Sequence, residues 1–448
     1  MLTPVTVLCG ELGAGKTTLL SGLLESTDRD VAVLVNDVGA VNVDADLVEA
    51  RTDLATGEEV VALENGCICC SLGGELSRSV VRLHREHAFD HLVIEASGVG
   101  EPEPIARQFV RGPAAGPYDL SSVITVVDAP RFHDRFADGP SAAAGSSGPP
   151  STTPPADETD TAPSRQGADE TGTKPLADLV LEQVEFCDLL IVNKCDLVTD
   201  AERDRVVAIL ETLQPAADIV ATEHGVLEPE TILEVQRFDL EEATDAAGWK
   251  RALEGEESAD EHDHSHGDHD GHEHSQDDVD SHDHAHDGDH NHAHPPEQYG
   301  IVVDSYHRRR PLHPERFAAL LEDLPAELIR AKGLCWIGGR ERQAITMSYA
   351  GTETTLEVTG RWIASFSEQR QETYRQGQPD LEWDQRWGDR ETRLALIGRD
   401  LDLEALTARL DDCLCTDAEL EGDWSSVDNP APTSSGESTV VSTGTDSS

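Results

Sequence analysis

Lysine, methionine and aromatic residues are scarce in this 448-residue chain. It has only five lysines and two methionines, and aromatic residues make up 4% of it. Its 34 Lys and Arg residues stand against 88 Asp and Glu residues, which gives a formal net charge of −54. Because so acidic a surface repels phosphate backbones, we exclude a nucleic-acid partner held by a basic face.

Long hydrophobic runs are also missing. No run approaches the roughly 20 apolar residues of a membrane-spanning helix, so we expect neither a membrane span nor a membrane partner. The chain starts with Met1-Leu-Thr-Pro and enters an apolar run without a basic segment or a small-residue cleavage site. We therefore expect no export signal and a cytoplasmic location.

The excess of acid over lysine is typical of a protein that works in concentrated salt. At 1 M salt the Debye length falls to about 3 Å, so the repulsion between acidic side chains is screened. We therefore expect a halophilic host. Disordered acidic segments would also raise the negative charge, but Asp and Glu are dense between the ordered motifs as well.

Short apolar runs recur along the first half of the chain, and each ends in a glycine or a polar residue. They cover residues 5–9, 31–35, 92–94, 123–127 and 189–192. Leucines at helical spacing follow the first run. This alternation predicts an α/β fold with a mainly parallel sheet, whose ligand-binding loops lie at the carboxyl ends of the strands. A smaller α+β C-terminal domain is expected after it.

Two low-complexity stretches and a Ser- and Asp-rich end divide the chain. We expect a first domain over 1–245 with a disordered insertion at about 137–175, a His- and Asp-rich linker over 246–298, a second domain over 299–415, and a disordered acidic tail over 416–448.

The first apolar run leads into a motif of the form G-x-x-x-x-G-K-[ST], between a predicted strand and a predicted amphipathic helix. This is the context of a P-loop, whose backbone N–H groups turn toward phosphates. Lys16 would reach the β- and γ-phosphates, and Thr17 would offer its hydroxyl to Mg²⁺. The predicted nucleotide-binding residues are Gly10, Gly13, Ala14, Gly15, Lys16, Thr17 and Thr18.

Glu95 ends the run at 92–94 and is followed by Ala-Ser-Gly98. A P-loop enzyme needs a carboxylate at a strand end to hold the water shell of Mg²⁺, and a nearby backbone N–H that senses the γ-phosphate. Together with Lys16 and Thr17, we therefore predict Glu95 and Gly98 as catalytic residues.

The motif Asn193-Lys194-Cys-Asp196 follows the run at 189–192. Asp196 can accept two hydrogen bonds from the N1 and N2 donors of guanine, which adenine lacks at those positions, while Lys194 covers the ring. The motif favours GTP over ATP. The alternative is that Asn193 and Asp196 merely cap a helix.

Three of the nine cysteines, Cys67, Cys69 and Cys70, lie within four residues of one another. They form a compact set of soft ligands for Zn²⁺ or a similar metal, rather than a disulfide framework. A site that must release its metal would keep a fourth position open. The alternative is a group of small buried thiols that are prone to oxidation.

Residues 260–294 contain twelve histidines among twelve acidic residues and no Lys or Arg, with His262, His264 and His266 at their start. So close a spacing predicts many weak, exchangeable metal sites suited to recruitment or buffering. Because neutral imidazole is the binding form, metal capture would weaken below about pH 6.5. The alternative is a solvated acidic spacer.

The order of the P-loop, the Cys-x-Cys-Cys block, the Glu95 strand and the Asn-Lys-x-Asp motif resembles the CobW family of P-loop GTPases, which are metallochaperones. The resemblance continues in Arg330-Ala-Lys-Gly-Leu-Cys-Trp336, Trp387-Gly-Asp-Arg390 and Ile397-Gly-Arg-Asp400, which are similar to the C-terminal domain of that family. It covers roughly four-fifths of the chain.

This resemblance implies GTP hydrolysis coupled to delivery of Zn²⁺, or in some members of Co²⁺ for cobalamin synthesis, with the metal at the Cys-x-Cys-Cys motif. The implied partner is a client metalloprotein or a cobalamin-synthesis enzyme. The family commonly has Asn-Glu-Phe-Gly after its second strand, where this chain has Asn36-Asp37-Val-Gly39, so Asp37 is a further candidate metal ligand. The family often has an aromatic residue where Glu11 stands here.

Our hypothesis is that GTP and Mg²⁺ order the loops around Asp37 and Gly98, that these loops reshape the cysteine site, and that hydrolysis releases the metal. No arginine or glutamine is evident in a position to complete the transition-state clamp, so we expect slow intrinsic turnover. Two other functions fit the sequence: a passive His-rich metal buffer, and a GTPase with a non-metal output. The sequence does not fix the oligomeric state.

Overall fold

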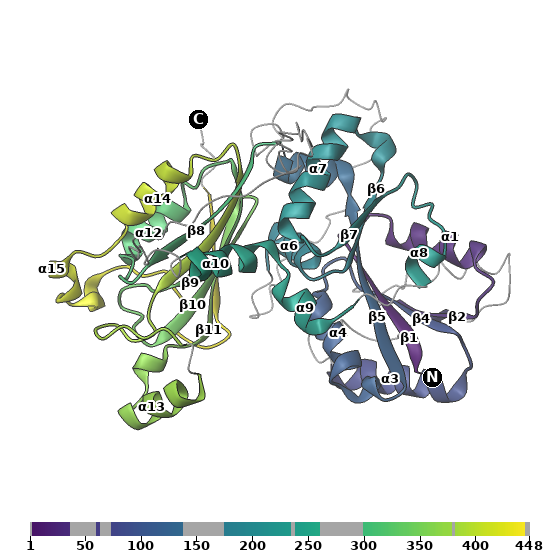
Figure 1. Ribbon diagram of the computed structural model, residues 1–448, viewed down its shortest axis with the longest axis horizontal. Coiled ribbons are helices and arrows are strands. Elements are labelled where there is room, and N and C mark those ends of the chain that lie inside the picture. The colour runs from purple at the N-terminus through teal and green to yellow at the C-terminus, as the bar shows by residue number, and fades with distance from the viewer. Residues whose placement is uncertain are drawn as a thin grey trace, which may run out of the picture.

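The computed structural model describes residues 2–35, 60–62, 73–137, 174–233, 238–259, 299–378 and 381–443. These residues form two domains that lie side by side, each built on one β-sheet (Figure 1). The division into an α/β domain and a smaller α+β domain agrees with the sequence prediction.

The first sheet has seven described strands in the order β3-β2-β4-β1-β5-β6-β7, and every neighbouring pair is parallel. The five predicted apolar runs all lie in strands of this sheet. They are buried on both faces, as parallel strands covered by helices must be. The strands are β1 Thr3–Cys9, β2 Val31–Val35, β3 Val60–Ala62, β4 His91–Glu95, β5 Tyr118–Asp128, β6 Leu189–Asn193 and β7 Asp218–Ala221.

Helices flank this sheet, and two separate apolar clusters pack its two faces. Helix α7 begins with a capping box, in which Thr199 and Glu202 satisfy each other's backbone N–H groups. The helices are α1 Lys16–Ser26, α3 Gly73–Glu86, α4 Pro102–Val110, α5 Ala129–Phe132, α6 Leu176–Glu185, α7 Asp200–Leu213, α8 Glu230–Leu233, α9 Leu240–Asp245 and α10 Gly248–Ala259.

The second sheet has six described strands in the order β13-β11-β10-β9-β12-β8, and every neighbouring pair is antiparallel. The apolar face of the sheet packs under α12 and α14. Its strands are β8 Ile301–Arg308, β9 Leu328–Cys335, β10 Gln343–Ala350, β11 Glu353–Arg361, β12 Thr392–Arg399 and β13 Ser438–Ser442. Its helices are α12 Pro314–Leu321, α13 Glu368–Gly377, α14 Leu403–Asp412 and α15 Asp417–Leu420.

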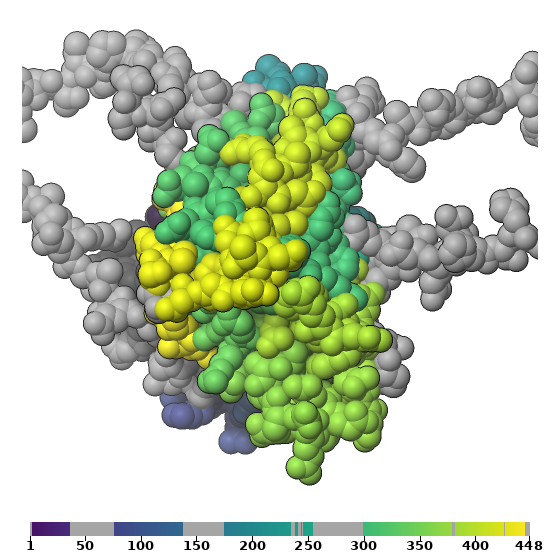
Figure 2. Space-filling view, turned by 90° about the vertical axis from the view of Figure 1, so that its left-hand side faces the viewer, coloured from purple at the N-terminus to yellow at the C-terminus, as the bar shows by residue number. Residues whose placement is uncertain are grey.

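The expectation of a disordered tail over 416–448 is wrong for residues 416–443. This segment contains α15 and β13, and β13 pairs with β11 along five residues. Ala431 is buried, and Arg340 donates to its carbonyl oxygen at 2.7 Å. Figure 2 shows the C-terminal segment lying over the outer face of the second domain. Composition misled here because backbone pairing at a sheet edge does not require apolar side chains.

The expected linker over 246–298 begins with helix α10, which lies against β8 and β12 of the second domain and against α7 of the first. In the expected insertion over 137–175, Ala137 closes a π-helical turn over His133–Ala137, and Lys174 is ion-paired just before α6. Residues 138–173 and 260–298 lie outside the described residues. Among the helices that the structure describes, none is long and apolar enough to cross a membrane.

Candidate nucleotide site

The P-loop joins β1 to α1 at the carboxyl edge of the first sheet. Gly15 adopts a left-handed backbone conformation with φ +105°. A Cβ atom at Gly15 would lie 2.3 Å from Nδ2 of Asn193, so only glycine fits between this loop and the Asn193 side chain. The same amide donates to the carbonyl oxygen of Ala14 at 2.9 Å. The two sequence motifs, separated by about 180 residues, are thus in direct contact.

Lys16 begins α1 and is buried, with 6% of its surface exposed. Its ammonium group donates to the carbonyl oxygens of Gly10 at 2.7 Å and Glu11 at 3.2 Å. These contacts hold the ammonium group inside the curve of the loop, on the side of the helix N-terminus. Such an arrangement concentrates positive charge where anionic phosphates bind. Thr18 follows in the first turn of the same helix.

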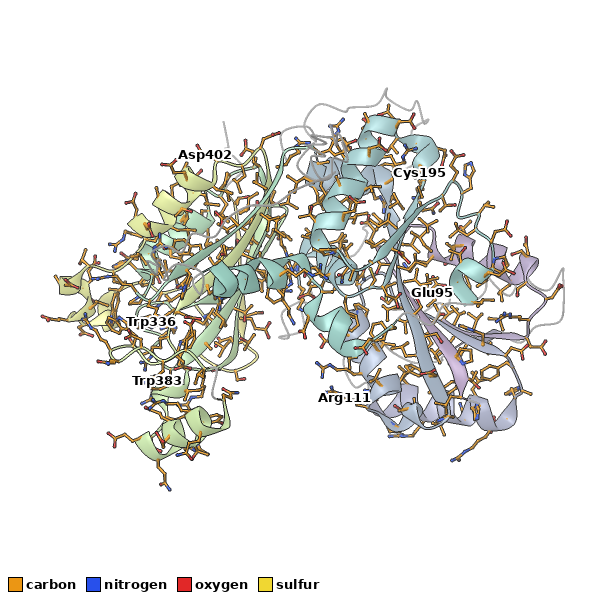
Figure 3. The ribbon with its side chains drawn as sticks, in the orientation of Figure 1. Glu95, Arg111, Cys195, Trp336, Trp383 and Asp402 are labelled. Carbon is orange, nitrogen blue, oxygen red and sulfur yellow. The ribbon has the colours of Figure 1, made fainter. Side chains whose placement is uncertain are left out.

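Glu95 ends β4 and is 3% exposed. The hydroxyl of Thr17 donates to Oε1 of Glu95 at 2.9 Å. Oxygen ligands of these two types suit Mg²⁺, which binds through few protein groups and keeps most of its waters. The structure therefore brings together the two residues that the sequence proposed for Mg²⁺. Figure 3 labels Glu95 within the first domain.

The loop after Glu95 approaches the P-loop closely at Gly98. A Cβ atom at Gly98 would lie 2.6 Å from the backbone nitrogen of Leu12, so a side chain there would push the two loops apart. Gly100 donates to the carbonyl oxygen of Ser97 at 2.8 Å, which closes a turn. Because Gly98 lies against the P-loop, a change at the phosphates would reach this loop directly.

Asn193 ends β6, and Lys194 and Asp196 lie in the turn that follows it. The side-chain oxygen of Asn193 accepts from the N–H of Gly225 at 2.9 Å. Lys194 is left-handed, with φ 64°, and its ammonium group donates to the carbonyl oxygen of Gly13 at 2.7 Å. The carboxylate of Asp196 lies 3.9 Å from Nε2 of His224. Asn193 and Lys194 thus fasten this motif to the P-loop. The helices that follow have Lys194, which makes no side-chain cap bond, and Thr199 as their N-cap residues, so neither Asn193 nor Asp196 caps them.

Three residues near the P-loop were missed by the sequence analysis. Asp128, at the end of β5, is 2% exposed and accepts from Nζ of Lys194 at 2.6 Å. Arg131 donates to the carbonyl oxygen of Leu12 at 2.6 Å. Both terminal nitrogens of Arg135 lie 3.3 Å from Oε2 of Glu11. Only the polar end of the run at 123–127 signals Asp128 in the sequence. The two arginines follow it without any motif.

These contacts change one expectation and explain one departure from the family pattern. Arg131 stands beside P-loop residue Leu12, although no arginine was evident near the nucleotide from the sequence. Glu11 stands where the family often has an aromatic residue, and Arg135 compensates its charge. The tertiary fold, and no local pattern, brings α5 and the turn after it to the P-loop.

Several predicted metal ligands lie outside the described residues: Asp37, Cys67, Cys69, Cys70, His262, His264 and His266. Within the described ranges, no group of three or more His, Cys, Asp or Glu residues could hold a metal ion. The described cysteines are poor ligand candidates where they are deeply buried. Burial raises the pKa of the Cys9 thiol to about 12, for example, so the thiolate that metals require is suppressed.

Comparison with known proteins identifies relatives over both domains. The family model described as "CobW/HypB/UreG, nucleotide-binding domain" matches residues 4–221, and that described as "Cobalamin synthesis protein cobW C-terminal domain" matches residues 301–414. The chain is 30% identical over 439 residues to "Zinc-regulated GTPase metalloprotein activator 1" of Dictyostelium discoideum, covering 93% of this chain and 81% of that protein.

The chain is also 32% identical over 234 residues to "Zinc chaperone CobW" of Pseudomonas aeruginosa, which covers 50% of this chain and 57% of that protein. Among solved structures, the Zn(II)-bound YjiA GTPase from E. coli aligns with 93% of this chain and 100% of its own, at 18% identity and a TM-score of 0.37.

Proposed function

Because the chain belongs to the CobW/HypB/UreG family of GTPases and carries the CobW C-terminal domain, we propose that it uses GTP to control the binding and delivery of Zn²⁺ to a client metalloprotein. In this proposal, Lys16 and the P-loop hold the phosphates, Thr17 and Glu95 hold Mg²⁺, and Asp196 selects guanine. Cys67, Cys69 and Cys70 bind the transported metal, which is cargo rather than a resident cofactor.

The observation that carries the proposal is the register of three neighbouring strands. Val35 pairs with both Ala62 and Glu95, so β2, β3 and β4 end together at the edge where Glu95 meets Thr17. Neighbouring strands lie about 4.8 Å apart. The chain therefore leaves β2 and β3 beside the Mg²⁺ ligands, on its way to Asp37 and Cys67.

Chain length sets how far the cysteines can lie from this edge. Cys67 comes five residues after Ala62, and an extended chain spans at most about 3.6 Å per residue, or about 18 Å. Metal and nucleotide sites within this range can share one loop. A γ-phosphate that fixes the loop would then alter the geometry offered to the metal.

The names of the relatives favour zinc as the cargo, because two of them are described by that metal. Thiolate ligands also accept Co²⁺, so a cobalt arm belongs in the test. The histidines that begin with His262, His264 and His266 would recruit metal, and hand it to the cysteines. The client is bound in this proposal by a surface that differs between the GTP and GDP states.

The test compares zinc affinity in two nucleotide states. Metal-stripped protein would be titrated with Zn²⁺ against a chromophoric chelator, with Mg²⁺ and either GDP or a non-hydrolysable GTP analogue, in high-salt buffer. We expect the affinities to differ at least fivefold, the lower end of ordinary allosteric coupling. Identical affinities in both states would refute the coupling. A parallel titration with Co²⁺ would show which metal is bound more tightly.

A Cys67→Ser/Cys69→Ser/Cys70→Ser variant should lose the nucleotide-sensitive metal site and any metal-dependent GTP turnover. The matched control is Cys413→Ser/Cys415→Ser in the second domain, where burial raises the pKa of both thiols to about 11. This control should behave as the unchanged protein. If the first variant kept metal-dependent turnover, the cysteines would not be the coupled site.

A further inference from the structure

Helix α6 contacts the loop that follows Glu95. Gln183 is 1% exposed, and its Nε2 donates to the carbonyl oxygen of Gly100 at 2.8 Å. Gly100 closes the turn that contains Gly98, whose backbone lies against the P-loop at Leu12. The inner face of α6 therefore fixes the backbone of the loop that stands next to the phosphates.

The outer face of α6 is bound to the second domain by a buried ionic cluster. Arg330 of β9 is fully buried, and its Nε and Nη2 donate to the two carboxylate oxygens of Glu185 at 2.7 and 2.9 Å. Its Nη1 donates to Oδ1 of Asp178 at 2.7 Å, and Ser348 donates to the same oxygen at 2.6 Å. Such bidentate, charge-assisted bonds fix orientation as well as distance.

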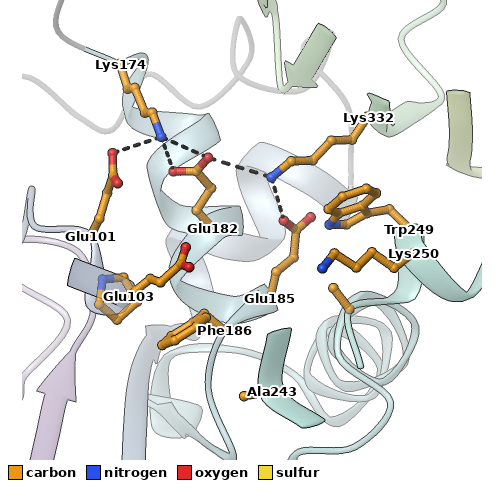
Figure 4. A pocket seen from close by; sticks show the side chains of 12 residues that line it. Glu101, Glu103, Lys174, Glu182, Glu185, Phe186, Ala243, Trp249, Lys250 and Lys332 are labelled. Carbon is orange, nitrogen blue, oxygen red and sulfur yellow. Dashed lines mark hydrogen bonds and ion pairs between the residues drawn. The ribbon is translucent and has the colours of Figure 1, made fainter. Parts of the chain in front are cut away.

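Two lysines complete the connection around a cavity of about 160 Å³ between the domains (Figure 4). Lys174 lies 2.8 Å from Glu101 of the loop and 2.8 Å from Glu182 of α6. Lys332 of β9 lies 3.7 Å from Glu182 and 3.3 Å from Glu185. A chain of charges thus runs from the loop, across α6, to the second sheet.

The use of lysine in the whole chain supports this connection. Three of the five lysines, Lys174, Lys250 and Lys332, line this cavity, and the other two are Lys16 and Lys194 at the nucleotide site. Each of the three is paired with a carboxylate, as Lys250 is with that of Asp245 at 3.2 Å. The cavity is therefore a junction held by ion pairs, and not a site for an anionic ligand.

We infer that the second domain takes part in GTP turnover through α6, with Gln183, Arg330 and Lys332 acting as positioning residues. They hold residues 97–101 so that the backbone N–H of Gly98 is positioned to bind the γ-phosphate of GTP. Only GTP carries that phosphate, so the contacts stabilise the GTP complex more than the GDP complex. The inference rests on the GTPase activity and does not need metal delivery.

Nucleotide binding and the contacts between the domains are thermodynamically linked, so the role of the second domain can be tested by measuring nucleotide affinities. If the domain interface favours GTP over GDP, weakening the interface must lower the affinity for GTP more than that for GDP. The readout is the ratio of the dissociation constant of a non-hydrolysable GTP analogue to that of GDP. A loss of overall stability would weaken the binding of both nucleotides alike and leave this ratio unchanged.

The first variant is Gln183→Leu, which removes the donor to Gly100 and replaces the amide with an apolar side chain of similar size. Dissociation constants would be measured with metal-stripped protein and added Mg²⁺ in high-salt buffer. We expect the ratio to rise at least fivefold, together with a fall in kcat. A ratio within twofold of that of the unchanged protein would overturn the inference.

The second variant removes the ion pairs between α6 and β9 of the second domain. Arg330→Met alone would leave two buried carboxylates without their cation and endanger folding, so it is combined with Asp178→Asn and Glu185→Gln. The matched control is Arg316→Met, because Arg316 makes a bidentate pair with Glu419 entirely within the second domain. The combined variant should raise the ratio as Gln183→Leu does, and the control should not.

Joining Gln183→Leu with the combined variant completes a double-mutant cycle. If both act on one connection, the joint effect on the ratio is smaller than the product of the separate effects. Independent, multiplying effects would show that Gln183 and the ionic cluster act separately, and would overturn the connection through α6. Zinc is absent throughout, so a failed metal coupling would leave this result standing.

Discussion

The carboxylate of Glu11, within the P-loop, lies 3.3 Å from both terminal nitrogens of Arg135. Glu11 is 5% exposed, so its charge is balanced by this arginine in place of water. The P-loop of this protein is therefore supported by a side chain that comes more than a hundred residues later. This relationship leads to the first prediction.

Arg135→Gln should destabilise the protein by about 3 kcal/mol, because it leaves a buried carboxylate without its cation. The free energy of unfolding would be measured by denaturant titration in high salt. Adding Glu11→Gln to Arg135→Gln should restore most of the loss, because both charges are then removed. If the double variant were as unstable as the single one, the ion pair would not be the cause.

Asp196→Asn should weaken the preference for GTP. In the proposed site, the Asp196 carboxylate would accept hydrogen bonds from two donors of guanine. The amide that replaces it would have one acceptor oxygen fewer, and its NH₂ group would face one of the guanine donors. Discrimination between GTP and ATP should fall by about a hundredfold, since a site built for hydrogen bonds loses most when they fail. Competition binding with both nucleotides measures it. Retained discrimination would place guanine recognition elsewhere.

Arg131→Gln should lower kcat for GTP at least tenfold, while the affinity for GDP stays within threefold. The guanidinium group stands beside Leu12 and is half exposed, so it can neutralise charge that develops on the phosphates as the bond to the γ-phosphorus breaks. Arg107→Gln is the control, because Arg107 is similarly exposed and also lies beside a carboxylate, that of Glu103, but both of these residues belong to α4. Equal kcat values for the two variants would contradict the prediction.

Stability should fall as the pH drops from about 6.5 toward 4, partly because of His91. This side chain is fully buried and hydrogen-bonded to Thr6 at 2.9 Å, and burial, with a smaller effect of Arg29, lowers its pKa to about 4. The unfolded chain takes up the proton near pH 6.5, before the folded protein does. Stability is therefore complete above pH 6.5 and is lost through this interval.

At pH 4, the loss of stability caused by His91 should reach about 3 kcal/mol, because its pKa in the folded protein is lowered by about two and a half units. Carboxylates titrate in the same range, so the measurement is the difference between the unchanged protein and His91→Gln across pH 4–8. The difference should shrink as the pH falls. A difference that is independent of pH would exclude His91 as a source of the acid sensitivity.

Removal of residues 434–448 should destabilise the second domain by about 2 kcal/mol, since it breaks several backbone hydrogen bonds between β13 and β11. Denaturant unfolding would report the loss. Removal of residues 444–448 alone is the control, because Thr443 makes the last bond of this pairing, to the carbonyl oxygen of Thr352. Equal stability of both truncated chains would show that β13 adds nothing.

The sequence pattern alone was sufficient to predict each feature whose residues lie within one short segment of the chain. The buried strands, the P-loop before α1 and the polar residue at each strand end follow from periodicity and motif. The fold class and the family were predicted on this basis. Pattern failed where a contact joins distant segments, as with Arg131 at Leu12, or where pairing is made by backbone alone, as with β13.

The sequence by itself determined the parallel α/β domain, the GTPase family and the two motifs Gly10–Thr17 and Asn193–Asp196, because each depends on residues close together in the chain. Only the tertiary structure decided that Arg135 balances Glu11, and that Arg330 binds α6 to the second sheet. Arg135 reaches Glu11 because β1 and β5 are neighbours in the first sheet, and Arg330 reaches α6 because the two domains pack together. The spacing of these residues along the chain does not indicate that they lie close together in space.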